Sequence, residues 1–403
     1  MRSRHLRSKS GIRALSTTAI MLTAVCSNVH ADATPKPGSI SVSGLADFYY
    51  AQNFNDPYPA SILGLVGGGS LSIDNVGRSF DVNNGIPSLS LFEVDLVRTE
   101  GKGIPFGLTA TLTAGDTAKV VEANEPGGQG WEAVQQIYAT KSFDVMKHDV
   151  TVDVGKFVTP FGQEVIESNG NDEYSRGFDF QYAIPFYHFG IRTNTPINSQ
   201  LNLYAALVNG WNDVADDNGS KSGILQLTWT PNSLSSYAFG WMTGNEGTGA
   251  YGTGIAPVGK GNIDTNLFEF LPTYQVTPKL KLAGELDYGQ GAGNSGPTHI
   301  SGDWLAMAGY AKYQLTATSD LAMRIEQFED QPGAGGISLR LGMPSYTKLR
   351  EITVTYEHDF FKGNVIARLE YRHDHSSQPF FLGSHGSTSV DQDTLEASAV
   401  VKF

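Results

Sequence analysis

Charged residues gather in one segment of the chain, residues 159–186, among Gly, Asn and aromatic side chains. Carboxylates are in the majority there, with one guanidinium: Glu164, Glu167, Asp172, Glu173, Arg176 and Asp179. Such a set can attract or orient ions and small polar solutes by charge. The sequence has no Gly-x-Ser-x-Gly elbow, no His-Glu-x-x-His and no other catalytic signature. We therefore expect this segment to act by electrostatics and name no catalytic residue.

Three other patterns bear on catalysis or on cofactors. Glu285 and Asp287 could act as a glycosidase pair, but alternating strand carboxylates are common in this chain and such a pair is uninformative. His373 and His375 share one strand face and are residue types that bind zinc, yet no third ligand is evident. The glycines at 67–69 lack the strand–loop–helix setting of a phosphate loop. We expect neither a metal nor a cofactor.

The elements that would position these residues are strands. Alternation of apolar and polar residues, the period of a half-buried strand, predicts sixteen of them, most long enough to cross a bilayer when tilted. Their ranges are 38–51, 88–100, 104–115, 131–143, 147–158, 187–195, 198–210, 221–230, 234–244, 263–275, 278–289, 302–315, 318–329, 346–359, 363–374 and 391–403. Several strands alternate cleanly and others less so, and segment 131–143 fits either phase.

The connections between these strands alternate in length. Tight turns such as 101–103 and 144–146 alternate with long Gly-, Asn- and Asp-rich segments, which are 52–87, 116–130, 159–186, 211–220, 245–262, 290–301, 330–345 and 375–390. Membrane barrels sort their short turns and long loops onto opposite ends in this way. Beyond the N-terminal leader no apolar run reaches about 18 residues, so a transmembrane helix is not expected. We predict an all-β fold, a transmembrane antiparallel up-and-down β-barrel of about sixteen strands.

The first 31 residues resemble a cleaved signal peptide. Basic residues precede the short apolar stretch 14–25, and Val29 and Ala31 fit a small-residue cleavage site. We expect residues 32–403 to form a single barrel domain. Acidic residues exceed basic ones by 41 to 28, which argues against a nucleic-acid partner. The single cysteine, Cys26, lies in the leader, so no disulfide is expected.

The strand phase assigns the wall charges. A charge facing lipid at mid-membrane costs about 2–4 kcal/mol, so the charged face must meet water in the lumen. Inward carboxylates are Asp47, Glu93, Asp95, Asp153, Glu285, Asp287, Glu326, Glu357 and Glu370, and inward cations are Lys281, Arg324, Arg368 and Arg372. The excess of acids predicts a mild cation preference. The same phase places Leu286 and Leu369 toward lipid and Val400 toward the lumen.

The third long loop, 159–186, is the candidate constriction, because a loop folded into the lumen would decide what passes. We expect its aromatic residues to pack against the wall and its carboxylates to face the water path. The alternative is a solvated surface loop. Lys156 falls on the lipid-facing phase of its strand, which suggests a bulge at Gly155 or a position at the barrel rim.

Several stretches resemble the OmpL-like β-barrel porins of Gram-negative bacteria. They are SVSGLADFYY at 41–50, GKFVTPFGQE at 155–164, YSR at 174–176, PFYHFG at 185–190 and RLEYR at 368–372. Of these, only the stretch between residues 155 and 190 is specific to the family. The resemblance implies an outer-membrane porin for passive diffusion of small hydrophilic solutes or ions. It names no substrate.

The last strand carries a further sign of the same kind. It ends in Phe403, which resembles the signal read by the outer-membrane assembly machinery. The expected partners are therefore outer-membrane lipid, that machinery, small hydrophilic solutes or ions, and two further copies in a homo-trimer. Two alternatives remain: a barrel that works as a surface enzyme or adhesin through its external loops, and a soluble exported β-protein.

Overall fold

The computed structural model describes residues 37–57, 74–101, 103–122, 131, 133–216, 218–246, 262–295 and 297–403. The predicted signal peptide, residues 1–31, lies outside these ranges and stays a prediction. In the described part of the chain, no helix is both long and apolar enough to cross a membrane.

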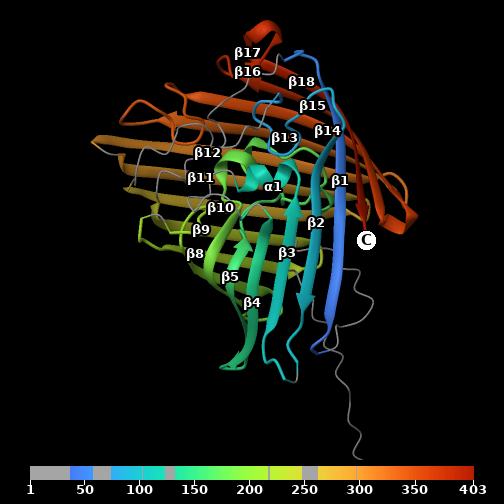
Figure 1. Ribbon diagram of the computed structural model, residues 1–403, viewed down its shortest axis with the longest axis vertical. Helices are drawn as coiled ribbons and strands as arrows, with labels where there is room; N and C mark the ends of the chain where they lie inside the picture. The colour runs from blue at the N-terminus through green and yellow to red at the C-terminus, as the bar shows by residue number, and fades with distance from the viewer. Residues whose placement is uncertain are drawn as a thin grey trace, which may run out of the picture.

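Sixteen antiparallel strands close into one barrel (Figure 1). Each strand pairs with its neighbours in sequence, and the last strand closes the sheet against the first. The strands are β1 (Ile40–Asn53), β2 (Ser88–Arg98), β3 (Gly107–Ala114), β4 (Val134–Val145), β5 (His148–Val158), β6 (Tyr187–Pro196), β7 (Leu201–Val208), β8 (Ser222–Asn232), β9 (Ser235–Glu246), β10 (Asn262–Thr277), β11 (Leu280–Ser295), β12 (Thr298–Gln314), β13 (Ser319–Pro332), β14 (Thr347–Phe360), β15 (Val365–Ser376) and β18 (Asp391–Lys402).

The predicted barrel is thus confirmed, and each predicted strand is present. The largest difference lies at β11 and β12, which almost meet where a loop over 290–301 was predicted. Gly291 and Gly293 occupy alternate positions of β11 and carry no side chain to show the strand period. The ambiguous phase of 131–143 has a physical cause, since the pairing of β3 with β4 shifts register between Thr111 and Leu112.

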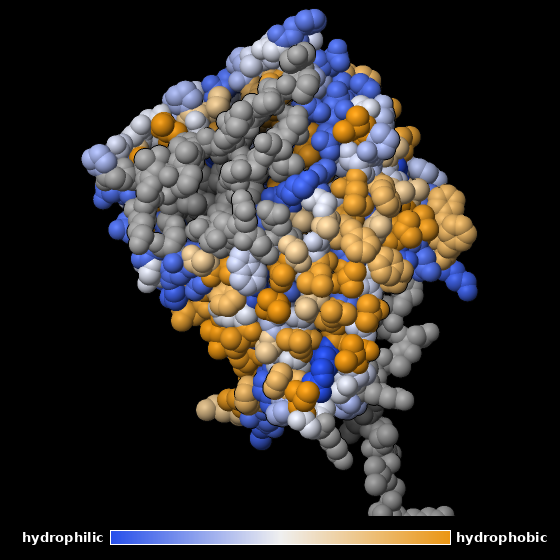
Figure 2. Space-filling view, in the orientation of Figure 1, coloured by the Kyte–Doolittle hydropathy of each residue, from blue (hydrophilic) through white to orange (hydrophobic). Residues whose placement is uncertain are grey.

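The outer surface of the barrel is apolar. Leu286 and Leu369 are 41% and 52% exposed, whereas Val400 is fully buried on the inward face beside Leu45 and Leu91. Figure 2 shows apolar side chains over the middle and lower part of the visible wall, with hydrophilic residues toward the top. This is the distribution that a barrel standing in a membrane requires, because its lipid-facing residues must be apolar.

The connections between the strands contain short elements that alternation did not reveal. They are helix α1 (Asp116–Val121), the turns η1 (Ser168–Gly170), η2 (Asp179–Ala183), η4 (Phe361–Gly363) and η5 (Ser384–Gly386), and the small ribbon of β16 (Phe381–Leu382) with β17 (Thr388–Ser389). Apolar residues from several loops, among them Phe80, Phe178, Trp211 and Leu341, join one buried cluster with Trp304 of the wall. Loops therefore fold into the barrel, where Figure 1 also shows α1.

Lys156 keeps the outward phase of β5. Strand pairing continues through Gly155 on both sides without a register shift, so the suggested bulge there is wrong. The lysine lies near the loop end of β5, and its ammonium contacts the Glu122 carboxylate and the Tyr187 ring. It is fully buried. The charge is thereby removed from lipid at the rim of the barrel.

Candidate functional site

The 159–186 loop, which connects β5 to β6, crosses the interior of the barrel. Its backbone N–H groups at Phe178 and Asp179 both donate to the carboxylate of Glu326 on β13. In the closed order of strands, β13 lies opposite β5. The η2 turn of the loop packs against β11, β12 and β13. The loop therefore lies in the lumen, and the alternative of a solvated surface loop is wrong.

Other carboxylates of the wall hold the loop in the same way. Glu370 on β15 accepts the N–H groups of Tyr174 and Ser175 at 2.6 and 3.0 Å. Glu285 on β11 accepts the N–H of Gln163 at 3.1 Å. A buried loop has no strand partner for its backbone, so its amides need acceptors from elsewhere. Hydrogen bonds to an ionised acceptor are stronger than those between neutral groups, so wall carboxylates are good acceptors for the loop amides.

The wall arginines bind the carbonyl side of the same loop. Arg368 on β15 donates to the carbonyl oxygens of Ser168 and Asn171, both at 3.0 Å. Arg324 on β13 donates to the Ser175 carbonyl at 2.7 Å and pairs with Glu164 of the loop at 2.5 Å. Both signs of wall charge therefore serve to fix the loop.

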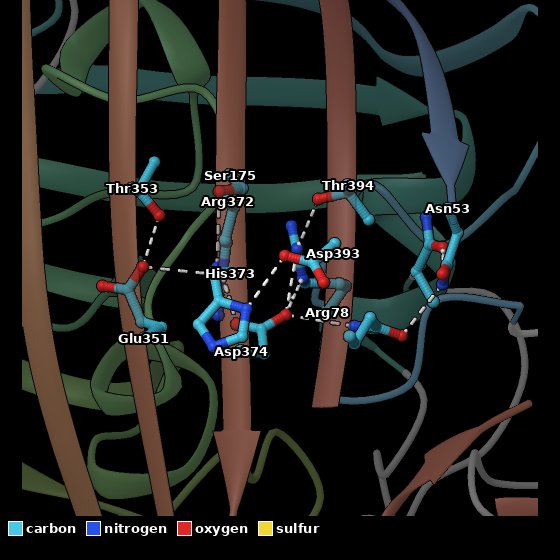
Figure 3. Close-up of polar contacts among 12 residues, drawn as sticks. Asn53, Arg78, Ser175, Glu351, Thr353, Arg372, His373, Asp374, Asp393 and Thr394 are labelled. Carbon is cyan, nitrogen blue, oxygen red and sulfur yellow. Dashed lines mark hydrogen bonds and ion pairs between the residues drawn. The ribbon is translucent and has the colours of Figure 1, made fainter. Parts of the chain in front are cut away.

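A second ionic network joins the loop after β1 to the wall near the external end (Figure 3). Asp374 on β15 lies between Arg78 and Arg372, which contact its carboxylate at 3.0 and 2.6 Å. Arg372 also donates to the carbonyl oxygen of Arg176 at 2.6 Å. All of these charged side chains are buried. Removing one partner from such a network would leave an uncompensated buried charge, which is strongly destabilising.

His373 and His375, which flank Asp374 in β15, lie on the opposite face of the strand from Asp374. His373 contacts Asp393 at 2.9 Å, and His375 contacts Asp391 at 2.6 Å (Figure 3 shows the first pair). Within the described residues each imidazole thus meets a carboxylate of its own, and no third ligand joins them. The arrangement is that of two hydrogen-bonded His–Asp pairs at the rim of the barrel.

The loop carboxylates occupy three kinds of environment. Glu164 is buried against Arg324, and Glu173 and Asp179 are buried inside the barrel. Asp172 and Glu167 keep part of their surface. The expectation that the loop's carboxylates face the water path is therefore wrong for Glu164, Glu173 and Asp179, because wall and loop close over them.

Two of these loop carboxyls have shifted pKa values. Burial opposes ionisation of Asp172, but the ammonium groups of Lys281 and Lys312 prevail and lower its pKa. For Glu173, burial dominates over the nearby Arg324 and raises the pKa well above its usual range. Asp172 thus supplies a persistent negative charge to the lumen, held 2.6 Å from Lys281.

The remaining predicted site residues also lie inside the barrel. They are Asp47, Glu93, Asp95, Asp153, Asp287 and Glu357, all of them buried. Asp47 accepts hydrogen bonds from Ser168 and Tyr174 of the loop. The structure therefore brings most of the predicted charges together around the 159–186 loop.

Charges that keep contact with solvent inside the barrel form a smaller set, nearer the short turns. Lys281, Lys312 and Asp172 form one group, and Lys312 also pairs with Asp320 and with the buried Glu357. On another part of the wall, Arg192 pairs with Asp153 at 2.8 Å. Lys312, Asp320 and Arg192 were not among the predicted residues. Lys312 and Arg192 share the inward phase of their strands with Tyr310 and His188, and this signal could have identified them.

A closed sixteen-strand barrel with an apolar exterior and a charged loop folded across its lumen defines the class of outer-membrane porins. The chain belongs to the family described as "Putative beta-barrel porin-2, OmpL-like", which matches residues 39–403. It is an outer-membrane porin and lies in the outer membrane. No curated protein matches the sequence.

Solved outer-membrane proteins share the fold at low sequence identity. In-vitro folded OmpT of Vibrio cholerae is 10% identical, with a TM-score of 0.57 over 91% of this chain and 98% of that one. An anion-selective porin from Comamonas acidovorans is 12% identical, with a TM-score of 0.55 over 91% and 100%. The DcaP channel of Acinetobacter baumannii is 9% identical, with a TM-score of 0.55 over 91% and 98%.

Proposed function

We propose that this porin conducts small hydrophilic solutes and ions by passive diffusion, through a lumen narrowed by the 159–186 loop. The observation that carries the proposal is the attachment of that loop to the opposite wall, through Glu326 on β13. A fixed obstacle inside a water-filled barrel sets both the size limit and the field that a solute meets.

We propose a weak cation preference. The acid excess of the whole chain supports it, since 41 acidic residues face 28 basic ones. Many strand carboxylates, however, accept hydrogen bonds from backbone N–H groups of the loop. Their charge therefore acts on the loop and less on the ions that pass. The charges nearer the water path have both signs, with Asp172 between Lys281 and Lys312. The preference should therefore be modest.

We further propose that the chain is a channel and not an enzyme. Glu285 and Asp287 are the two strand carboxylates considered as a glycosidase acid–base pair. Both are buried beneath the 159–186 loop. Glu285 is also bound to the Gln163 N–H and the Tyr310 hydroxyl. A bulky substrate could not reach these groups while the loop is in place.

A homo-trimer is the proposed assembly. One solved structure with the same fold is a trimer form of OmpT of Vibrio cholerae. Light scattering of the refolded protein in detergent should give a mass of three chains. A mass of one chain under conditions that preserve conductance would exclude the trimer.

We propose that the C-terminal residue contributes to assembly of the barrel. Phe403 exchanges two backbone hydrogen bonds with Gly44 of β1, at 2.9 and 3.0 Å. Its ring also stacks on Phe92, with centroids 6.3 Å apart. Deleting Phe403 should lower the yield of folded protein in the outer membrane, and an unchanged yield would exclude this role.

Conductance in a planar bilayer tests the proposed function directly. The refolded protein should give discrete, ohmic steps, and liposomes that contain it should swell in small sugars. An enzyme or adhesin working through its external loops would give neither signal. Wild-type conductance that does not depend on the 159–186 loop would retain the channel but exclude the constriction.

A further inference from the structure

Three carboxylates from two parts of the chain converge inside the barrel. Asp179 comes from the η2 turn of the 159–186 loop, and Glu285 and Asp287 come from successive inward positions of β11. One oxygen of each lies within 4.8 Å of the others, and all three residues are buried. Because the loop and β11 are remote in sequence, no sequence motif marks these residues as a metal centre.

Two of the three carboxylates lack compensating partners among the described residues. Glu285 is satisfied, since it accepts hydrogen bonds from the Gln163 N–H and the Tyr310 hydroxyl. Both side-chain oxygens of Asp179 and both of Asp287 accept none. Two cations of the wall on β13 and β11 form their ion pairs elsewhere: Arg324 pairs with Glu164 and Glu351, and Lys281 pairs with Asp172. Buried carboxylates without hydrogen bonds or counter-charges are strongly unfavourable, so these two side chains point to a missing ligand.

We propose that Asp179, Glu285 and Asp287 bind a calcium ion, which clamps the 159–186 loop to β11. Carboxylate oxygens are the ligands that calcium prefers. They bind it at about 2.3–2.6 Å, which allows ligand oxygens on opposite sides of the ion to lie about 4.6–5.2 Å apart. The oxygens of this cluster lie within 4.8 Å of one another, so one calcium ion can reach all three. Magnesium binds at about 2.0–2.1 Å and requires a tighter octahedron.

The position of the ion gives it a mechanical role. The η2 turn already packs against β11, β12 and β13, and the Asp179 N–H binds Glu326. An ion between Asp179 and β11 adds a second attachment at the same turn and neutralises a concentration of negative charge. The effect of calcium on conductance rests on the proposed channel function, whereas binding of the ion does not.

Calorimetric titration of CaCl2 into the refolded, EDTA-treated barrel in detergent tests the site. The wild-type protein should bind one calcium ion per chain. Asp179→Asn and Asp287→Asn should each weaken binding at least tenfold. Asp216→Asn is the matched control, because it removes the same charge from an external loop where Asp216 pairs with Lys221, and it should bind as the wild type does. Absence of stoichiometric binding to the wild type, or unchanged binding by both cluster variants, would overturn the proposal.

A second measurement keeps the test valid if the cluster variants do not fold. The thermal unfolding midpoint of the wild type should rise in CaCl2 relative to EDTA, and rise less in MgCl2 at equal concentration. No rise with calcium would also overturn the proposal. Calcium binding without any conductance would leave the site intact and reject the channel. Conductance without calcium binding would leave the channel intact and reject the calcium site.

Discussion

Glu326 on β13 accepts the backbone N–H of Phe178 at 2.7 Å, although Phe178 belongs to a loop carried by β5 on the opposite side of the barrel. The same carboxylate also accepts the N–H of Asp179. One wall side chain thus fixes two successive peptide groups of the loop inside the barrel. The loop that crosses the barrel interior is therefore irregular in backbone and held in place by side chains of the strands.

Removing that acceptor should release the loop. Glu326→Ala leaves two buried N–H groups unsatisfied, at a cost of about 1–3 kcal/mol for each group and about 2–6 kcal/mol for both. We expect the free energy of unfolding in urea, measured in detergent micelles, to fall by about that amount. Glu329→Ala on the same strand removes a partly exposed ion pair with Lys348 and an acceptor for the Gln327 side-chain amide, and such an ion pair contributes about 1 kcal/mol at most. Equal losses for both variants would mean that Glu326 does not anchor the loop.

Gly155 occupies a backbone conformation that few other residues adopt. Its φ is 142°, and a Cβ there would lie 2.2 Å from the carbonyl oxygen of Ile137. Gly155→Ala should therefore distort the pairing of β4 with β5 and lower stability by about 1–3 kcal/mol. Gly223→Ala is the control, because a Cβ at Gly223 meets nothing within 4 Å. Heat-modifiable gel mobility measures the folded fraction. Equal folded fractions for Gly155→Ala and Gly223→Ala would contradict the backbone strain expected at position 155.

The orientation of the strands predicts where arginine is tolerated. Leu286→Arg and Leu369→Arg place a charge on the exposed outer surface, at a cost of about 2–4 kcal/mol near mid-membrane. Thr228→Arg places the same group on the inward face of β8, where Thr228 is only half-buried. We expect folding into lipid vesicles to fail for the two leucine variants and to continue for Thr228→Arg. Three equal yields would exclude a lipid-facing role for the leucines. Val400 is a poorer control because it is fully buried.

Ion preference should respond to the lysines near the water path. Lys281→Gln combined with Lys312→Gln removes two cations that hold Asp172. Reversal potentials across a KCl gradient should then shift toward stronger cation preference. The shift should shrink in 1 M salt, where the screening length is about 3 Å. Lys348→Gln, outside the lumen beside Glu329, should leave the potential unchanged. A shift of opposite sign would mean that these lysines do not face the conducted ions.

Strand positions and their inward faces followed from the sequence because side-chain alternation is a local property. The charged side chain of Glu326 was correctly assigned to the inward face of the wall, and the apolar side chain of Leu286 to the outward face. Local patterns failed where the backbone departs from the simple period. The register shift beside Leu112 obscured the phase of β4, and the glycines of β11 obscured its length.

The site itself depended on contacts between distant parts of the chain. Nothing in the local sequence around Glu326 or Glu370 indicates that these carboxylates accept loop amides, because their partners lie far away in sequence. For the same reason Asp179 could be named as a loop carboxylate but not placed beside Asp287. The charge balance of the loop suggested exposed carboxylates, whereas closure of the wall around it buries Glu164 and Glu173.

Single-channel conductance with and without the 159–186 loop is the decisive measurement for a porin narrowed in this way. Replacing residues 161–184 by a short Gly/Ser linker should leave the barrel closed, since its backbone hydrogen bonds run between strands. We expect a larger unit conductance than that of the wild type and entry of larger sugars in liposome swelling. Unchanged conductance and an unchanged size limit in a correctly folded variant would show that the 159–186 loop does not narrow the path.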